Sequence, residues 1–449
     1  MSVPGLQLAE APDAPAERTI TINAGREWCF EVSHGSTLEL KLTHGTAEIF
    51  GTELPLSQKF TFSGTKAAVY TWNGCTLEIT GSPSVGYISE EVPMSEYINL
   101  HFALEKARGR AAELNGGQGP RVMIVGPEDA GKTSLVKTLA GYAVRSGRKP
   151  VVVNLDPKEG MLSLPGTLTA VSFNTILDVE EGWGTSLTSG PGPVPAKTPL
   201  VYYYGMERPS ENEKLYRKLS ARMALAVTSK LSSSDVNRAS GCIIDTSGLL
   251  ASKQSYDLIS HIVAEFSVDT IVVLGSERLY SDMTRRFEER AQNPVAVVKL
   301  QKSGGCVDRE ESYLKQTRET AIKGYFFGEP KRTLSPYTLT VGFDEMHLWK
   351  VGEVSNIGAE LLPAGETHSQ PLYSKIEPSV GLQHAVLAVL NADLGDKEEV
   401  FAESTVMGFV YVSSVDDQKR IMKILTPVSG RLPKKPLIVG AFPERVSNL

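Results

Sequence analysis

The chain has 449 residues, of which 41% are hydrophobic and 22% are charged, and its formal net charge is −6. This length allows two or three domains, and the composition is typical of an ordinary globular protein. A protein that coats nucleic acid through bulk charge should be basic, so we expect any RNA contact to be local or made through a partner.

Targeting segments and cysteine spacing indicate the cellular compartment of the protein. No apolar stretch is long enough to span a bilayer, and residues 1–18 lack the apolar core of a signal peptide. The cysteines at 29, 75, 242 and 306 lack metal-type spacing. We therefore expect reduced cysteines in a cytosolic or nuclear protein that does not contact membranes.

Residues 18–80 alternate apolar and polar side chains with a period of two. Short runs of this kind, separated by turns at 23–25, 34–35 and 73–74, predict an all-β domain built as a small antiparallel sandwich or barrel. A helix is predicted over 95–112, with Ser95 as its N-cap, before residues 115–120 break the chain. We place the first domain at residues 1–98.

Residues 99–332 form the predicted central domain, in which strands and helices alternate. The expected strands are 122–125, 151–155, 200–204, 242–245, 271–274 and 295–300. Continuous apolar strands with intervening helices indicate a mostly parallel sheet buried on both faces, which gives an α/β fold. The Gly-, Pro- and Ser-rich stretch at 182–199 reads as a loop. Residues 333–449 return to β character and form a predicted third domain, mixed but mostly β.

The sequence of residues 126–133 is GPEDAGKT, the phosphate-binding loop pattern of P-loop NTPases. A predicted strand precedes it and a predicted helix follows. Glycines let backbone N–H groups turn toward phosphate oxygens, and the helix N-terminus adds partial positive charge. Lys132 would reach the β- and γ-phosphates, and Thr133 would hold Mg²⁺. The nucleotide-binding candidates of this motif are Gly126, Asp129, Ala130, Gly131, Lys132, Thr133 and Ser134.

Two aspartates end predicted neighbouring strands. Asp245 could complete the magnesium site with Thr133, although an aspartate at a strand end can simply cap a turn. Asp156 could accept a proton from an attacking hydroxyl, or could be a turn residue before a proline. Residues 298–303 lack the aspartate of a guanine-specific signature, which argues against a GTPase.

Further motifs extend along nearly the whole chain. They lie at 27–28, 45–54, 163–167, 240–242, 302–305 and 324–328. Together with the phosphate loop they resemble the polynucleotide 5′-hydroxyl-kinase family. The run at 183–190 is similar to the fungal branch that supplies a subunit of pre-mRNA cleavage factor IA.

The resemblance implies a nuclear protein with three domains that binds ATP and Mg²⁺ between the first two. In the family the base of ATP is held partly by the residues that correspond to Glu27 and Lys66. The resemblance also implies a protein partner, the cleavage factor IA subunit that binds the C-terminal domain of RNA polymerase II, and other cleavage and polyadenylation subunits.

Three departures from active kinases bear on catalysis. Leu249 replaces a tryptophan that stacks on the RNA end, and leucine has no π face. Arg309 matches the first of two lid arginines, but the second position is Leu314, beside Lys315. Residues 158–160 read Lys-Glu-Gly instead of a Gly-Gln turn. Losing a lid arginine could slow phosphoryl transfer by roughly 10³ or more.

Three hypotheses follow. The favoured one is an ATP-binding scaffold of pre-mRNA 3′-end processing, required for endonucleolytic cleavage and without kinase turnover. The alternative is an RNA 5′-hydroxyl kinase with Asp156 as the base and with Lys132 and Arg309 stabilising charge. A third is a nucleotide-driven switch, which would need a mobile loop such as 182–199.

Overall fold

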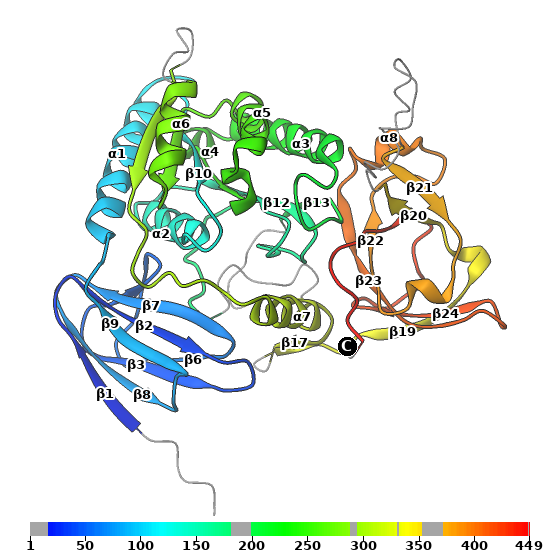
Figure 1. Ribbon diagram of the computed structural model, residues 1–449, viewed down its shortest axis with the longest axis horizontal. Helices are drawn as coiled ribbons and strands as arrows, with labels where there is room; N and C mark the ends of the chain where they lie inside the picture. Colours follow the sequence, from blue (N-terminus) through cyan, green and yellow to red (C-terminus); the bar gives the residue numbers. More distant parts are fainter. Residues whose placement is uncertain (1–16, 181–198, 288–293, 330–331, 353–370, 448) are drawn as a thin grey trace, which may run out of the picture. The chain divides into compact units, whose positions relative to one another are not determined.

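The computed structural model describes residues 17–180, 199–287, 294–329, 332–352, 371–447 and 449 (Figure 1). They separate into two compact units, one ending at Val92 and the other beginning at Pro93. The predicted loop at 182–199 and the motif at 183–190 lie outside the described residues, apart from Pro199. The domain limits at 98 and 332 stay a prediction. No described helix is both long and apolar enough to cross a membrane.

Two antiparallel sheets build the N-terminal unit, which confirms the predicted all-β domain. The strands are β1 Glu17–Ile22, β2 Arg26–Val32, β3 Leu38–Gly45, β4 Glu48–Ile49, β5 Thr52–Glu53, β6 Lys59–Phe62, β7 Thr65–Thr71, β8 Cys75–Thr80 and β9 Val85–Ser89. The sheet orders are β1-β8-β3-β6 and β5-β4-β7-β2-β9. Leu38, Leu40 and Leu42 alternate inward along β3 and are almost fully buried. Phe30 of one sheet contacts Phe62 of the other, with ring centroids 5.2 Å apart.

A mixed sheet forms the centre of the second unit. Its strands are β10 Arg121–Val125, β11 Val151–Leu155, β12 Thr167–Ser172, β13 Leu200–Tyr203, β14 Cys242–Thr246, β15 Thr270–Leu274 and β16 Ala296–Leu300. They lie in the order β13-β12-β11-β14-β10-β15-β16. The strands from β11 to β16 in this order pair in parallel, as predicted, whereas β12 and β13 pair antiparallel.

Strand β12 is missing from the sequence prediction because polar residues interrupt its apolar ones. Thr167 and Thr169 are fully buried on it. Their hydroxyls donate to the carbonyl oxygens of Leu164 and Met161 at 2.7 and 2.8 Å, so burial costs little. An apolar-run rule cannot find such a strand.

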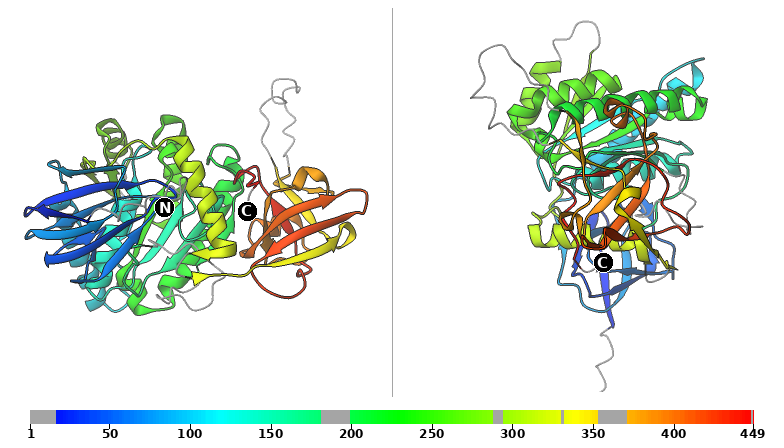
Figure 2. Two further views of the ribbon diagram at one scale, coloured as in Figure 1. Left: turned by 90° about the horizontal axis from the view of Figure 1, so that it is seen from below. Right: turned by 90° about the vertical axis from the view of Figure 1, so that its right-hand side faces the viewer.

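Helices surround the central sheet (Figures 1 and 2). They are α1 Met94–Glu113, α2 Lys132–Arg145, α3 Glu213–Ser232, α4 Asp235–Ser240, α5 Tyr256–Phe266, α6 Glu277–Phe287 and α7 Glu311–Phe327, with the 3-10 turns η1 Gly248–Ala251 and η2 Lys253–Ser255. The prediction of Ser95 as the N-cap of α1 is wrong, because the helix starts earlier. Pro93 holds that position, with no side-chain cap. Arg108 is buried on α1, where its Nε donates to the carbonyl of Ser240 at 3.0 Å.

The rest of the second unit is mostly β, as predicted. After the hairpin β17 Gly328–Glu329 and β18 Arg332–Thr333 come β19 Tyr337–Gly342, η3 Phe343–Glu345, β20 Leu348–Val351, β21 Tyr373–Ile376, η5 Val380–Leu382, β22 Val386–Leu390, α8 Glu398–Phe401, β23 Val406–Asp416, β24 Ile421–Thr426 and β25 Leu437–Val439. The sheet order is β19-β24-β23-β22-β25-β20-β21.

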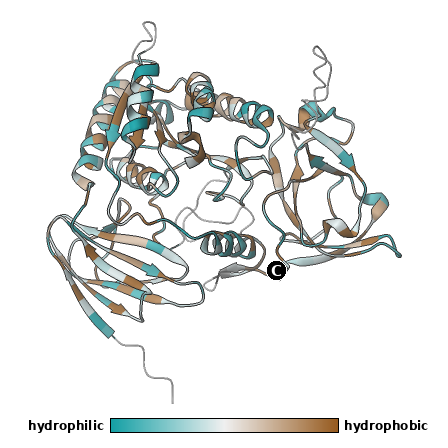
Figure 3. Ribbon diagram, in the orientation of Figure 1, coloured by the Kyte–Doolittle hydropathy of each residue, from teal (hydrophilic) through white to brown (hydrophobic). Residues whose placement is uncertain are grey.

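One hydrophobic core joins this sheet to the central one, and Figure 3 shows apolar residues along the strands of both. Tyr203 of β13 donates to the carbonyl of Phe442 and accepts from the amide of Gly440, at 3.2 and 3.1 Å. A Cβ on Gly440 would meet the carbonyl oxygen of Gly205 at 2.1 Å, so the close approach of the two segments requires glycine there.

Candidate nucleotide-binding site

The phosphate loop connects β10 to α2 in the geometry that the sequence predicts. A Cβ at Gly126 would lie 2.6 Å from the carbonyl oxygen of Leu274, and Gly131 adopts φ 86° just before the helix. Both positions therefore need glycine. Helix α2 has no side-chain cap, so the N–H groups of its first turn remain available to an anion. This arrangement fits a nucleotide phosphate group.

Lys132 begins α2 and is buried, with 7% of its surface exposed. Its ammonium group donates to the carbonyl of Pro127 at 2.7 Å, within the same loop. Ala130 is a buried residue of the loop, and the carbonyl of Ser134 accepts a hydrogen bond from the Thr138 hydroxyl. The charge of Lys132 therefore lies at the loop itself.

The two predicted magnesium ligands touch. The hydroxyl of Thr133 donates to Oδ2 of Asp245 at 2.6 Å. They meet because β14 pairs in parallel with β10, which places Asp245 opposite Ile124. Burial raises the pKa of Asp245 to about 6, although the Thr133 hydrogen bond and the charge of Lys132 oppose this. A hydroxyl beside a buried carboxylate is a donor set suited to Mg²⁺.

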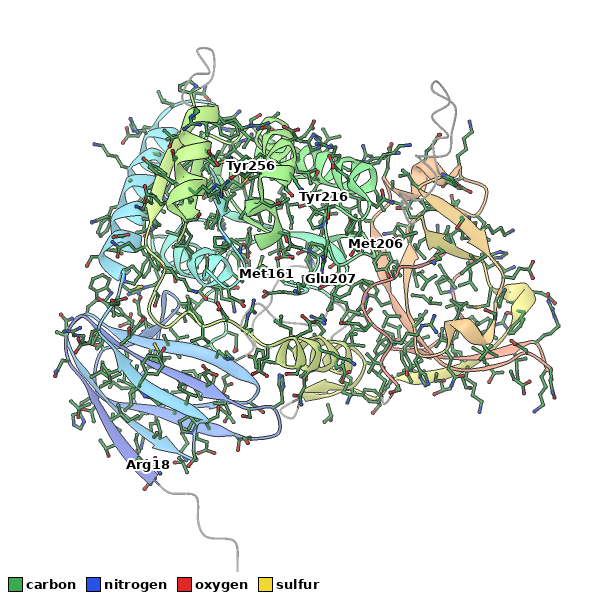
Figure 4. The ribbon with its side chains drawn as sticks, in the orientation of Figure 1. Arg18, Met161, Met206, Glu207, Tyr216 and Tyr256 are labelled. Carbon is green, nitrogen blue, oxygen red and sulfur yellow. The ribbon has the colours of Figure 1, made fainter. Side chains whose placement is uncertain are left out.

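Asp156 follows β11, the strand on the other side of β14. Its Oδ1 accepts from the amide of Lys158 at 3.0 Å. Tyr216, labelled in Figure 4, donates to the carbonyl of Leu155 at 2.8 Å and so fixes the end of the strand. Burial, followed by the charge of Glu159, raises the pKa of Asp156 to about 7. Such a carboxyl can take up or release a proton near neutral pH.

Arg309 is bound to two carboxylates. Its backbone amide and its Nε donate to the two oxygens of Asp129, at 2.8 and 2.6 Å. Its terminal nitrogen donates to Glu159. Burial opposes ionisation of Glu159, but the Arg309 guanidinium overcomes it and lowers the pKa of that carboxyl. The charge of Arg309 is thus already compensated by its own chain.

Sequence reasoning missed Glu159 as a partner of Arg309, and it missed the ion pairs of Lys158. The Lys158 ammonium lies 3.3 Å from Glu128, 3.5 Å from Glu207 and 3.8 Å from Glu311. Glu207 follows β13 and is labelled in Figure 4. The Lys-Glu pair at 158–159 was the available signal, but its partners are distant in sequence.

The structure also shows the surroundings of two positions at which the sequence differs from active kinases. Leu249 is half-buried in η1, whose Gly248 packs on the backbone of Glu128. Leu314 is buried on α7, with 8% exposed, and Lys315 beside it is exposed. The second lid position therefore faces the core.

The two remaining predicted residues lie in the N-terminal unit. Glu27 is buried on β2. Lys66 of β7 forms an ion pair with Glu31 at 2.7 Å. Glu27 and Lys66 belong to the first compact unit and the phosphate loop to the second, and the contact of Glu27 and Lys66 with an ATP base stays a prediction.

P-loop nucleotide-binding proteins share this order of parallel strand, glycine-rich loop and helix, with an acidic strand end alongside, and the chain is of that class. Three family models match it in succession. They are described as the N-terminal beta-sandwich domain of polyadenylation factor over residues 21–111, the mRNA cleavage and polyadenylation factor CLP1 P-loop over 126–328, and pre-mRNA cleavage complex II protein Clp1 over 334–444. The chain belongs to the Clp1 family of mRNA cleavage and polyadenylation factors.

Curated relatives with the same description match this chain over their full length or nearly so. The mRNA cleavage and polyadenylation factor clp1 of Botryotinia fuckeliana is 51% identical over 461 residues, covering 100% of both chains. The factor of the same description from Phaeosphaeria nodorum is 44% identical over 467 residues, covering 100% of this chain and 99% of its own.

Solved structures of related proteins have the same fold. One, described as the wild-type Clp1p–Pcf11p complex, has a TM-score of 0.85 and 29% identity, and covers 96% of this chain and 99% of that chain. A second has the same TM-score of 0.85 and identity of 29%. It is described as an extended interface between Pcf11p and Clp1p with a structural basis for ATP loss in a point mutant.

Proposed function

We propose that this protein is an ATP-binding scaffold subunit of the pre-mRNA cleavage and polyadenylation machinery, required for endonucleolytic 3′-end cleavage. It retains nucleotide and does not turn it over as a kinase. The full-length relatives are described as mRNA cleavage and polyadenylation factors, which supports a role in pre-mRNA 3′-end processing. The same description supports a site of action in the nucleus.

The main observation against kinase turnover is that Arg309 is paired with carboxylates of its own chain. Phosphoryl transfer is accelerated mainly by positioning and by cations aimed at the transferring group. Arg309 is held by Asp129 and Glu159, and the second lid position is a buried leucine. Neither position offers a free cation to a transition state.

ATP and Mg²⁺ fit the residues present. The loop amides and Lys132 would hold the phosphates, and Thr133 and Asp245 would hold the metal, which neutralises phosphate charge when bound. A related structure whose description refers to ATP loss in a point mutant supports ATP as the nucleotide.

The proposed partner is a subunit of the Pcf11 type. Solved neighbours of this chain are complexes of Clp1p with Pcf11p. We expect the corresponding cleavage factor IA subunit, which also binds the RNA polymerase II C-terminal domain, to dock on this chain. Other cleavage and polyadenylation subunits then reach it through the complex.

A second candidate function, RNA 5′-hydroxyl kinase, has one observation in its favour. The pKa of Asp156 is raised to about 7, which suits a general base at neutral pH. Its carboxyl lies at the strand edge that also carries Asp245.

One preparation separates the two functions. Purified protein is denatured and the released nucleotide is identified, while the same batch is assayed with γ-labelled ATP and a 5′-hydroxyl RNA. Stoichiometric ATP without label transfer supports the scaffold. Label on the RNA, abolished by Lys132→Ala, would establish the kinase, and protein without any nucleotide affinity would refute both.

A further inference from the structure

Residues 301–310 run from β16 to α7 and are anchored at their start by helix α1. The amide of Gln301 donates to the carboxylate of Glu96 at 2.9 Å. The carbonyl of the same residue accepts from the hydroxyl of Tyr97 at 3.0 Å. The beginning of the segment is therefore fixed independently of the phosphate loop.

The rest of the segment lies against the phosphate loop. A Cβ on Gly131 would come within 2.5 Å of the Cys306 sulfur, so the thiol packs directly on this glycine. At the far end, Arg309 binds Asp129 through both its backbone and its side chain. Asp129 is itself a loop residue, held at φ 54° with 12% of its side chain exposed. The segment thus contacts two residues of the motif that would hold phosphates.

Glu159 adds the contact that completes this closure. Its carboxylate pairs with the terminal nitrogen of Arg309 and belongs to the turn after β11. One guanidinium therefore ties three segments together: the phosphate loop, the 157–160 turn and residues 301–310. The carboxylates of Asp129 and Glu159 also repel each other, and Arg309 offsets that repulsion.

We propose that Glu159 and Asp129 hold Arg309 so that residues 301–310 stay closed against the phosphate loop and slow the release of a bound nucleoside triphosphate. The inference rests on the proposed ATP binding and adds a mode of retention to that same site. Glu159 is here a positioning residue that acts through Arg309.

The contacts are of the kind that can control a release rate. A guanidinium bonded to carboxylates forms charge-assisted hydrogen bonds, which are stronger than neutral ones. The Arg309, Asp129 and Glu159 side chains are 27%, 12% and 35% exposed, so water screens them only in part. Opening the segment would break several such bonds at once.

The test measures nucleotide release from the full chain. Protein loaded with a fluorescent ATP analogue is mixed with excess unlabelled ATP, and the fluorescence decay gives the release rate. Glu159→Gln keeps the shape and removes the charge, and Asp129→Asn does the same on the loop, where asparagine tolerates positive φ. We expect release from each to be about tenfold faster or more. Association of the triphosphate should be at least as fast as in the wild type, because each change removes a negative charge near the phosphates.

Two further variants distinguish the opening of residues 301–310 from a general loss of stability. Arg309→Ala leaves both carboxylates unpaired and should slow association of the polyanion, and Glu159→Gln in the same chain should restore part of that rate. Arg217→Ala removes an arginine that is 33% exposed and pairs with Glu213 on α3, so it should leave both rates unchanged. Hydrogen exchange of residues 301–310 should accelerate in Glu159→Gln and not in Arg217→Ala.

Wild-type release rates in both Glu159→Gln and Asp129→Asn would overturn the proposal while leaving ATP binding intact. Wild-type protein that binds no nucleotide would overturn both the retention mechanism and the proposed function. Faster release without faster exchange of 301–310 would also contradict the mechanism, because the segment would then not be what opens.

Discussion

Thr133 and Asp245 share a 2.6 Å hydrogen bond although 112 residues separate them in the chain. Parallel pairing of β10 with β14 brings them together. Asp245→Asn keeps the size of the side chain and removes the charge that a metal ion would meet. We expect ATP affinity in the presence of Mg²⁺ to fall about tenfold or more, as is typical when a hydrogen bond to a charged group is lost.

Calorimetric titration with Mg²⁺ and with a chelator checks this prediction. Without the metal, the variant should bind ATP at least as well as the wild type, because a carboxylate near the phosphates has gone. Asp257→Asn, at an exposed position, is the matched control. An equal loss of affinity with and without Mg²⁺ would show that Asp245 supports the structure of the site and does not bind the metal.

Lys132→Ala should remove most of the stabilisation that ATP provides. A ligand that binds only the folded state adds about 2.7 kcal/mol at 100 times its Kd. Lys132 is the buried cation of the loop, so its loss should remove most of that gain. The melting temperature is measured with and without ATP, with Lys149→Ala, an exposed lysine, as the control. An unchanged ATP-induced shift would contradict the assigned role.

Asp156 should make the nucleotide-free protein less stable as pH rises. Its folded pKa is about 7 against an ordinary 3.8. Between these values the folded carboxyl keeps a proton that the unfolded chain has lost, so the penalty grows with pH and is complete above about 7. Asp156→Asn should therefore stabilise the protein at about pH 8 by about 1–2 kcal/mol, after allowance for partial exposure, and hardly at about pH 4.

Urea unfolding across that pH range measures the effect. Asp257→Asn, at an exposed position, serves again as the control. A constant difference between Asp156→Asn and wild type at every pH would mean that the substitution acts through packing and not through ionisation.

Arg318 should hold the segment around residues 442–446 against α7. Its guanidinium is 3% exposed, donates to Glu444 at 3.0 Å and to Glu311 at 2.7 Å, and lies 5.4 Å from the ring centroid of Phe442. Arg318→Ala leaves two carboxylates that water can reach, so we expect a loss of about 2 kcal/mol, less than for a fully buried pair.

Unfolding titrations and hydrogen exchange of residues 440–447 report on Arg318→Ala. The exposed pair of Arg286 with Asp257 supplies a control, since Arg286→Ala should cost well under 1 kcal/mol. If exchange at 440–447 is unaltered in Arg318→Ala, the arginine does not hold that segment.

The parts of the site that could be predicted are those that local sequence determines. The phosphate loop needs a strand, a glycine turn and a helix in immediate succession, and all three are readable from residues 121–139. Asp156 and Asp245 follow apolar strands, and the carboxyl ends of parallel strands meet at one edge.

Pairing between distant charged side chains could not be predicted in the same way. Arg309 and Glu159 are 150 residues apart, and nothing in the pattern of either segment selects the other. Leu314 looks like a lost arginine in the sequence, and only the packing of α7 places it in the core. The contacts that restrain the site are therefore the least visible in the sequence.

The hydrogen bond from Tyr203 to the carbonyl of Phe442 spans 239 residues. At translation rates of about 5–20 residues per second, the ribosome needs about 12 to 48 s to supply the second partner after the first. During that interval β13 is at the sheet edge without this partner, an exposed strand of the kind that invites wrong pairing. The contact that covers this end of the central sheet is thus among the last that a nascent chain of this protein can form.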